Sequence, residues 1–406
     1  MIVDAVWAVL VVLALLAAIA SAVSLAQGVL MAGHVRRGLR TMFGAYLPRV
    51  VLILPVRGLD EGFDENLRAI LAQSYPAFRV IVVADVDSDP ALERVRAVSS
   101  EFPRLSLSIV LADADGIAGK VNALRSALAR LEPADDVIAF ADTDIRPPPG
   151  WLRQLVQPLA DPSVGVATGF RWYVPPRPTF WSLVRTEWNA VSANVLFDPR
   201  RSFAWGGSSA IRREHLPQLR LEERWRGVLS DDLVLTDAVR RAGLRIEYVP
   251  MALVPTFEGC DRATCLEWCF RQMTLATLYL PIVRRYAAIS FAIFNGSVIL
   301  GVLSILLAVL VRPDFVIPAG VFLLPLPASV VKSWLRRRAL LSAVPDVAGA
   351  WTASAWRTAL ASLAVPWVMM AGLLQTRHSR TVRWRGRMYD ASDPHHVRLV
   401  DNSRAP

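Results

Sequence analysis

Three clusters of aspartates lie between apolar segments in this chain, and their positions carry the clearest chemical meaning. They are Asp85, Asp87 and Asp89, then Asp142 and Asp144, then Asp231 and Asp232. The first two clusters directly follow the apolar runs Val80–Ala84 and Val137–Ala141, which are typical of buried parallel strands. Carboxylates at the carboxyl ends of parallel strands lie where open α/β sheets bind ligands. Hard oxygen ligands gathered there suit Mg²⁺ or Mn²⁺ and a phosphate-bearing substrate.

An alternation of strands and helices is expected to position these acids. Apolar runs bounded by turn residues predict strands, and segments with helical periodicity predict helices. The alternation favours one α/β domain over residues 48–258 with a mostly parallel sheet. In chain order the expected elements are the strand Val50–Pro55, the helix Asn66–Ser74, the strand Val80–Ala84, the helix Ala91–Ser99, the strand Leu105–Leu111, the helix Lys120–Leu131 and the strand Val137–Ala141.

The composition places other parts of the chain in a lipid bilayer. Of the 406 residues 54% are apolar, and the net charge of +10 is concentrated where arginines crowd beside apolar stretches. No nucleic-acid partner is expected, because these basic residues do not form a patch interleaved with aromatic side chains. Four segments reach or approach the roughly 20 apolar residues that a membrane span needs, and the first exceeds this length. They are Ala5–Met31, Ile289–Val311, Phe315–Val331 and Thr358–Leu374.

The arginines predict how the chain is oriented. Arg36, Arg37 and Arg40 follow the first apolar run and no positive charge precedes it, so we expect an uncleaved anchor instead of a cleaved signal peptide. The domain at 48–258 would then lie in the cytoplasm, at a bacterial inner membrane. A full fourth crossing would put the basic stretch Arg377–Arg387 outside, so a re-entrant or interfacial hairpin, or an extra partial span near Ala339, stays open.

These observations divide the chain into five regions. The expected regions are a membrane anchor with its basic flank at 1–47, the α/β domain at 48–258, an interfacial region at 259–287, membrane or re-entrant segments at 288–376 and a basic tail at 377–406. The cysteines Cys260, Cys265 and Cys269 lack the spacing and the histidine partner of a zinc site, so we expect them in a packing or interfacial helix. A disulfide framework is not expected, which favours a reducing compartment.

Several segments, taken in their order along the chain, form a recognisable pattern over roughly residues 48–390. They are Val56–Pro76, Asp85–Pro90, Gly116–Lys120 with Asn122, Asp142–Arg146, Trp205–Ser208 with Ile211–Arg213, Ser230–Asp232 with Thr236–Gly243, and Val382–Arg387. These segments resemble the inverting family 2 glycosyltransferases, and more closely their membrane-bound ceramide glucosyltransferase-like, or family 21-like, branch. The resemblance implies a GT-A-like domain that binds a nucleotide sugar, with transmembrane helices at both ends.

The donor roles follow from this resemblance. Asp85 would bind the uracil or ribose of the donor, and Asp87 and Asp89 would serve the same pocket. Lys120 would contact a phosphate or the uridine. Asp144 would hold the metal, and Asp142 would orient the ribose or the water shell of the metal. The residues alone also allow helix capping by Asp89 and an exposed helix position for Lys120.

The acceptor roles follow in the same way. Asp232 would be the general base that deprotonates the acceptor hydroxyl, with Asp231 supporting it, although an Asp pair at a helix start can also act as a cap. Gly206 and Gly207 would instead help to bind the donor by letting the backbone approach its sugar, or would simply form a tight turn, and Trp205 would be a stacking face on the acceptor side.

One departure from the family pattern concerns the acceptor side. Family members commonly carry Gln or Arg followed three residues later by Arg-Trp. Here Arg271 or Gln272 fills the first position, but Arg-Trp is missing. Both residues lie in the stretch Cys265–Tyr286, which we expect to be an interfacial amphipathic helix or a core-packing helix. The missing pair argues against a processive enzyme.

The acidic clusters and this resemblance together imply a metal-dependent inverting transferase. It would move a hexose from a UDP-sugar to the hydroxyl of a membrane lipid, such as a ceramide-like lipid, a diacylglycerol or a hopanoid-type lipid. The alternatives are a processive polysaccharide synthase and a non-catalytic membrane binding module built on a decayed transferase fold.

Overall fold

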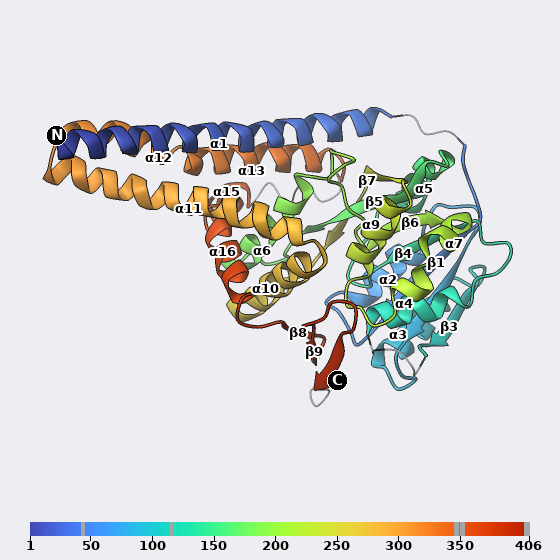
Figure 1. Ribbon diagram of the computed structural model, residues 1–406. Helices are drawn as coiled ribbons and strands as arrows, with labels where there is room; N and C mark the ends of the chain where they lie inside the picture. Colours follow the sequence, from blue (N-terminus) through green and yellow to red (C-terminus); the bar gives the residue numbers. More distant parts are fainter. Residues whose placement is uncertain (42–44, 114–116, 118, 345–348, 350–353, 402–406) are drawn as a thin grey trace.

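The computed structural model describes residues 1–41, 45–113, 117, 119–344, 349 and 354–401. It consists of an α/β domain and a bundle of long helices that projects from this domain (Figure 1). The chain starts at the far end of the bundle and enters the α/β domain after α1, Ile2–Arg40. It later returns to the bundle, and its last strands lie beside the α/β domain again (Figure 1).

The α/β domain is built on a seven-stranded sheet in the order β3-β2-β1-β4-β6-β5-β7. Only β6 runs antiparallel to its neighbours, β4 and β5, and the other pairs are parallel. The expected α/β class with a mostly parallel sheet is therefore confirmed. The strands are β1 (Val50–Val56), β2 (Phe78–Ala84), β3 (Leu107–Leu111), β4 (Val137–Ala141), β5 (Val164–Tyr173), β6 (Ser208–Arg212) and β7 (Arg245–Thr256).

Helices cover both faces of this sheet, because successive side chains of a strand point to opposite faces. Leu52 and Leu54 of β1 belong to the core on one face, and Val51 and Ile53 belong to the core on the other. A strand buried on both faces needs a continuous apolar run, which is the pattern that predicted it. The helices of the domain are α2 (Phe63–Leu71), α3 (Pro90–Ser99), α4 (Lys120–Leu128), α5 (Trp151–Val156), α6 (Phe180–Ala193), α7 (Leu216–Leu219), α8 (Leu221–Arg224) and α9 (Asp231–Arg241), with short 3₁₀ turns at Gln157–Ala160 and Arg213–His215.

Three helices of the described chain are long and apolar enough to cross a membrane, namely α1, α11 (Pro281–Leu310) and the segment Pro313–Leu341. The last comprises the 3₁₀ turn Pro313–Phe315, α12 (Val316–Phe322) and α13 (Pro325–Leu341). A fourth candidate is the pair α15 (Ala355–Ala361) and α16 (Val365–Gln375), which is bent by 40°. The outward side chains of α1 are apolar and exposed, as a lipid-facing surface requires.

The expected single helix over Cys265–Tyr286 is two helices in the structure. α10 spans Arg262–Tyr279 and α11 starts at Pro281, because proline begins a helix readily but cannot continue one. Cys265 and Cys269 are buried in α10, with their Sγ atoms 4.0 Å apart. This burial agrees with a core-packing helix, which was one of the two alternatives for this stretch.

The tail forms a small antiparallel sheet of β8 (Thr381–Trp384), β9 (Arg387–Asp390) and β10 (Arg398–Asp401). Val382, Tyr389 and Val397 pack with Leu229 and Leu275 in one hydrophobic cluster. This cluster fixes the tail on the loop that precedes α9, which carries the third aspartate cluster.

Candidate active site

The sheet brings acids from separate parts of the chain to one edge. Asp85 follows β2, Asp142 and Asp144 follow β4, and Asp231 and Asp232 begin α9. All five line one cavity of about 1450 Å³. Parallel strands end at the same sheet edge, so the expected meeting of these clusters follows from the topology.

Lys120 joins the second and third clusters. As the first residue of α4, it forms ion pairs with Asp142 at 2.8 Å and with Asp231 at 3.1 Å. Burial alone would lower the pKa of the Lys120 ammonium, but the two carboxylates outweigh burial and raise it. Lys120 is therefore a charged member of the site and not an exposed helix lysine. Residues 116 and 118 of the segment Gly116–Lys120, which resembles the family pattern, lie outside the described residues.

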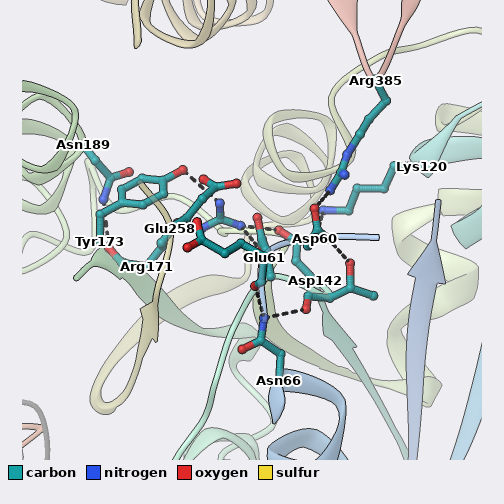
Figure 2. Close-up of polar contacts among 12 residues, drawn as sticks. Asp60, Glu61, Asn66, Lys120, Asp142, Arg171, Tyr173, Asn189, Glu258 and Arg385 are labelled. Atoms are coloured by element: carbon teal, nitrogen blue, oxygen red, sulfur yellow. Dashed lines mark hydrogen bonds and ion pairs between the residues drawn. The ribbon is translucent and has the colours of Figure 1, made fainter. Parts of the chain in front are cut away.

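Arg171, which was not among the predicted site residues, holds the two acids of the second cluster together. Its Nη2 donates to Asp142 at 2.9 Å (Figure 2). The same nitrogen donates to Asp144 at 2.7 Å. The guanidinium also lies over the ring of Trp205, 5.0 Å from the ring centroid. The available signal was a single arginine inside the apolar strand β5, every residue of which is buried.

The pKa values of the two acids diverge because their partners differ. Burial raises the pKa of Asp144 to about 6, and Arg171 opposes burial only in part. Burial acts in the same direction on Asp142, but Lys120 and Arg171 together lower the pKa of that carboxyl below its usual value. Near neutral pH, a proton and a metal cation would therefore compete for the carboxylate of Asp144.

The donor set fits a divalent cation held in part by substrate. Among the described residues, no group of three or more His, Cys, Asp and Glu side chains could hold a metal by itself. Asp142 and Asp144 nevertheless converge on one cationic nitrogen of Arg171, so a positive charge between them is accommodated. Mg²⁺ commonly uses one or two carboxylates and takes its other ligands from water and phosphate.

Asp232 has a carboxylate oxygen available for proton transfer. Its Oδ1 accepts hydrogen bonds from Ser230 Oγ at 2.5 Å and from the Leu233 backbone N–H at 2.8 Å. Its Oδ2 accepts none from the described residues. Ser230 also caps α9, so Asp232 shares the capping role and uses only its Oδ1 for it. Burial raises the pKa of Asp231, the acid paired with Lys120, to about 6.

Of the first aspartate cluster, Asp85 lines the cavity, whereas Asp87 and Asp89 do not. Asp85 lines the cavity and pairs with Arg57 at 3.1 Å and with Arg387 at 2.5 Å. Asp89 instead caps α3, accepting from the backbone N–H of Ala91 at 2.9 Å, which is the capping alternative. Asp87 is exposed, pairs with Arg96 at 3.2 Å and does not line the cavity.

Gly206 and Gly207, which follow Trp205, let the backbone lie close to the acids of the site, whereas the sequence predicted a close approach to a sugar. A side chain at Gly206 would collide with the Asp231 carboxylate, and one at Gly207 would collide with the Trp205 ring and lie 2.6 Å from Asp142 Oδ2. Glycine is therefore needed here to bring the Trp205 loop against both acids. Trp205 itself lines the cavity.

Arg271 and Gln272 of α10 line the same cavity. Arg271 lies over Trp384 of the tail at 5.5 Å from the ring centroid. The structure thus brings all three predicted acceptor-side residues, Trp205, Arg271 and Gln272, to the same cavity, and it adds Trp384 from the tail as an aromatic partner of Arg271.

The tail contributes further charged residues that were not predicted as site residues. Arg385 pairs at 2.6 Å with Asp60, a buried acid that follows β1 and accepts from Thr143 Oγ1 at 2.7 Å (Figure 2). Arg387 pairs with Asp85. The signals were present in the sequence, since Asp60 follows a predicted strand and both arginines lie in the segment that resembles the family tail.

Comparison with known proteins places this geometry in a family. A family model described as glycosyl transferase family 21 matches residues 9–397. Among solved structures, a mannosyltransferase from Pyrobaculum calidifontis in complex with GDP-Man and Mn²⁺ is 20% identical, with 90% of this chain and 99% of that chain covered and a TM-score of 0.46. A glucosyl-3-phosphoglycerate synthase from Mycobacterium tuberculosis in complex with Mn²⁺ and UDP is 18% identical, covers 53% of this chain and 73% of its own, and has a TM-score of 0.34.

Proposed function

Because the chain belongs to glycosyl transferase family 21, we propose that it transfers a hexose from a UDP-sugar to a hydroxyl group of a membrane lipid, with inversion at the anomeric carbon. The observation that carries this proposal is the shared cavity. Asp142, Asp144 and Asp232 line it together with residues of α1, of α11 and of the segment that contains α13, and all three of these are long and apolar enough to span a membrane. A site of this form can receive a soluble donor and a bilayer-bound acceptor together.

Asp232 is the general base in this proposal. Its Oδ2 is available to take the proton of the acceptor hydroxyl while that oxygen attacks the anomeric carbon and the bond to the diphosphate breaks. Inversion needs one base on the face opposite the leaving group. Asp231 forms an ion pair with Lys120, and both side chains lie against Gly206 of the Trp205 loop. These contacts hold the start of α9, and with it Asp232, in place.

The donor binds across the remaining acids in this proposal. Asp85 contacts the uracil or ribose, and Lys120 supplies positive charge near the phosphates. Asp144, assisted by Asp142, would hold Mg²⁺ or Mn²⁺, which when bound neutralises charge on the leaving diphosphate. Trp205, Arg271 and Gln272 lie on the acceptor side of the same cavity.

We place the α/β domain on the cytoplasmic face of the cell membrane. Arg36, Arg37 and Arg40 end α1, and Arg336–Arg338 lie near the end of α13. Both helix ends lie toward the α/β domain (Figure 1). Positive charge accumulates on the cytoplasmic side of membrane helices, which supports this orientation.

The test is UDP release by the purified full chain in detergent. The assay contains Mn²⁺ or Mg²⁺, a panel of UDP-sugars and a total polar lipid extract, and it compares wild type with Asp232→Asn and with Asp87→Asn as a control. We expect release that requires metal, one sugar and lipid, and that falls about 10²-fold or more in Asp232→Asn because the general base is lost. Asp87→Asn should keep wild-type activity, since Asp87 lies outside the cavity. Equal release from wild type and Asp232→Asn would refute the assignment of the base.

A further inference from the structure

The cavity is too large for the nucleotide sugar alone. Pockets that enclose one small molecule have volumes of roughly 300–1,000 Å³, whereas this cavity has about 1450 Å³. Its additional wall comes from the helix bundle, with Ser24 and Gln27 of α1, Phe291 of α11 and Lys332 of α13. A second ligand therefore has room between the catalytic acids and the membrane helices.

Lysine is rare in this chain, and both of its lysines line the cavity. The chain contains 45 lysines and arginines together, yet its only lysines are Lys120 and Lys332. Both line the same cavity, one at the catalytic acids and the other at the helix bundle. Lysine differs from arginine in presenting a compact ammonium with three rotatable donors.

Lys332 has no acidic partner among the described residues. Its Nζ donates to Ser24 Oγ at 2.9 Å, and no carboxylate of the described chain pairs with it. Arg336, one turn further along α13, is by contrast paired with Glu187. A cation inside a membrane-spanning segment is costly and commonly marks a functional site.

The packing of α1 is arranged around this lysine. A Cβ atom at Gly28 would lie 3.0 Å from Lys332 Cγ, so glycine gives the lysine stem room to reach Ser24. Ser24 lies about two helical turns before Met31, where the apolar run ends ahead of Arg36. Ser24 therefore lies roughly 10 Å along the helix axis inside the end of the apolar run, where an ammonium group needs oxygen partners from the protein or from a ligand.

We propose that Lys332, with Ser24 and Gln27, binds the oxygen-bearing head region of the acceptor lipid, which enters from the bilayer between α1, α11 and α13. The remaining N–H groups of Lys332 require oxygen acceptors, which hydroxyl, carbonyl or phosphate groups can supply. The lipid tail stays beside the apolar helices, and the acceptor hydroxyl extends along the cavity to Asp232. This inference rests on the proposed transfer to a lipid.

The test uses the full chain in phosphatidylcholine nanodiscs that contain increasing amounts of a total polar lipid extract, separated into neutral and acidic fractions. At saturating UDP-sugar, Lys332→Met should raise the half-saturating lipid concentration about tenfold, as loss of a charge-assisted hydrogen bond predicts, and leave the donor KM unchanged. Lys332→Arg should retain most lipid affinity. Arg338→Met is the matched control, because Arg338 is an exposed cation of the same helix that does not line the cavity.

A second readout separates this inference from the transfer reaction. Mass spectrometry of lipid retained after purification should show a lipid on wild type and on Arg338→Met, and its loss by more than half from Lys332→Met, with unchanged thermal unfolding. Activity with the acidic fraction would identify phosphate as the oxygen source, and activity with the neutral fraction would identify hydroxyl or carbonyl groups. Unchanged lipid saturation and retention in Lys332→Met would overturn the inference. Lipid retention that depends on Lys332 without any UDP release would refute the proposed transfer alone.

Discussion

At the scale of single residues, the carboxylates of Asp142 and Asp144 are held by Arg171 in a position that a metal ion would also favour. Arg171 balances two buried negative charges, and its partners are less than a quarter exposed. Removal of one partner from a buried ion pair is strongly destabilising, because the remaining charges lose their compensation. A bound divalent cation could provide the same compensation.

We therefore expect Arg171→Met to make stability depend on metal. The substitution should lower the free energy of unfolding by about 3 kcal/mol without metal, and Mn²⁺ should restore a large part of it by binding the folded state only. Thermal unfolding with and without Mn²⁺ measures this. Arg79→Met is the control, since it breaks the buried pair with Asp135 outside the cavity and should gain no more from Mn²⁺ than wild type. Equal Mn²⁺ responses of both variants would contradict a metal site at Asp142 and Asp144.

If Asp144 is the metal ligand that we propose, metal use should also depend on pH. Burial raises the pKa of Asp144 to about 6. A proton therefore competes with the cation below that pH, whereas the carboxylate is deprotonated above it. The Mn²⁺ concentration for half-maximal UDP release should thus be constant above pH 7 and rise by up to about tenfold per pH unit well below pH 6. Mn²⁺ titrations between pH 5 and 8 measure it. A half-maximal concentration that does not change over this range would exclude Asp144 as the ligand.

At the scale of elements, the tail sheet β8–β10 contributes Trp384 and Tyr389 to the wall of the cavity in which we propose that the donor binds. Arg387 of β9 is buried against Asp85, which also pairs with Arg57. The pairs orient the Asp85 carboxylate at the end of β2, where the proposed uridine contact lies. The tail is therefore expected to affect donor binding although it is distant from β2 in the sequence.

Arg387→Met should raise the KM for the UDP-sugar about tenfold with little change in kcat, because Asp85 keeps only one of its two cationic partners and loses a charge-assisted hydrogen bond. Steady-state kinetics with saturating lipid measures both parameters. The control is Arg398→Met, an exposed arginine of β10 in the same small sheet. A lower kcat at unchanged KM would instead assign the tail a role in the chemical step.

The comparison of elements also shows what the sequence can and cannot predict. The strands before Asp85 and Asp142 were predicted because their apolar runs are local signals of burial on both faces. The partners of those acids were not, because Arg171 reaches Asp142 only through the order β4-β6-β5, which joins distant segments. The roles of Asp87 and Asp89 could not be separated either, since a capping Asp and a ligand-binding Asp look alike in a βα loop.

At the scale of the whole molecule, the tail decides how often the chain can cross the membrane. Arg385 and Arg387 pair with Asp60 and Asp85, so the tail and the α/β domain lie on the same side. If α11 and the segment Pro313–Leu341 each cross once, they return the chain to that side. One further full crossing by α15 and α16 would carry the tail away, which is incompatible with these ion pairs.

The bent pair α15–α16 is therefore expected to enter the membrane without crossing it, which favours the hairpin among the alternatives that the sequence left open. A fluorescent protein that matures only in the cytoplasm should fluoresce when fused after residue 406 and remain dark when fused before Met1. Fusions after Val311, in the turn between the two spans, should also be dark. Bright amino-terminal and dark carboxyl-terminal fusions would reverse the orientation but keep the crossing number, because both ends would still lie on opposite sides. Two bright or two dark ends would require an even number of crossings, and the three-span arrangement would then be wrong.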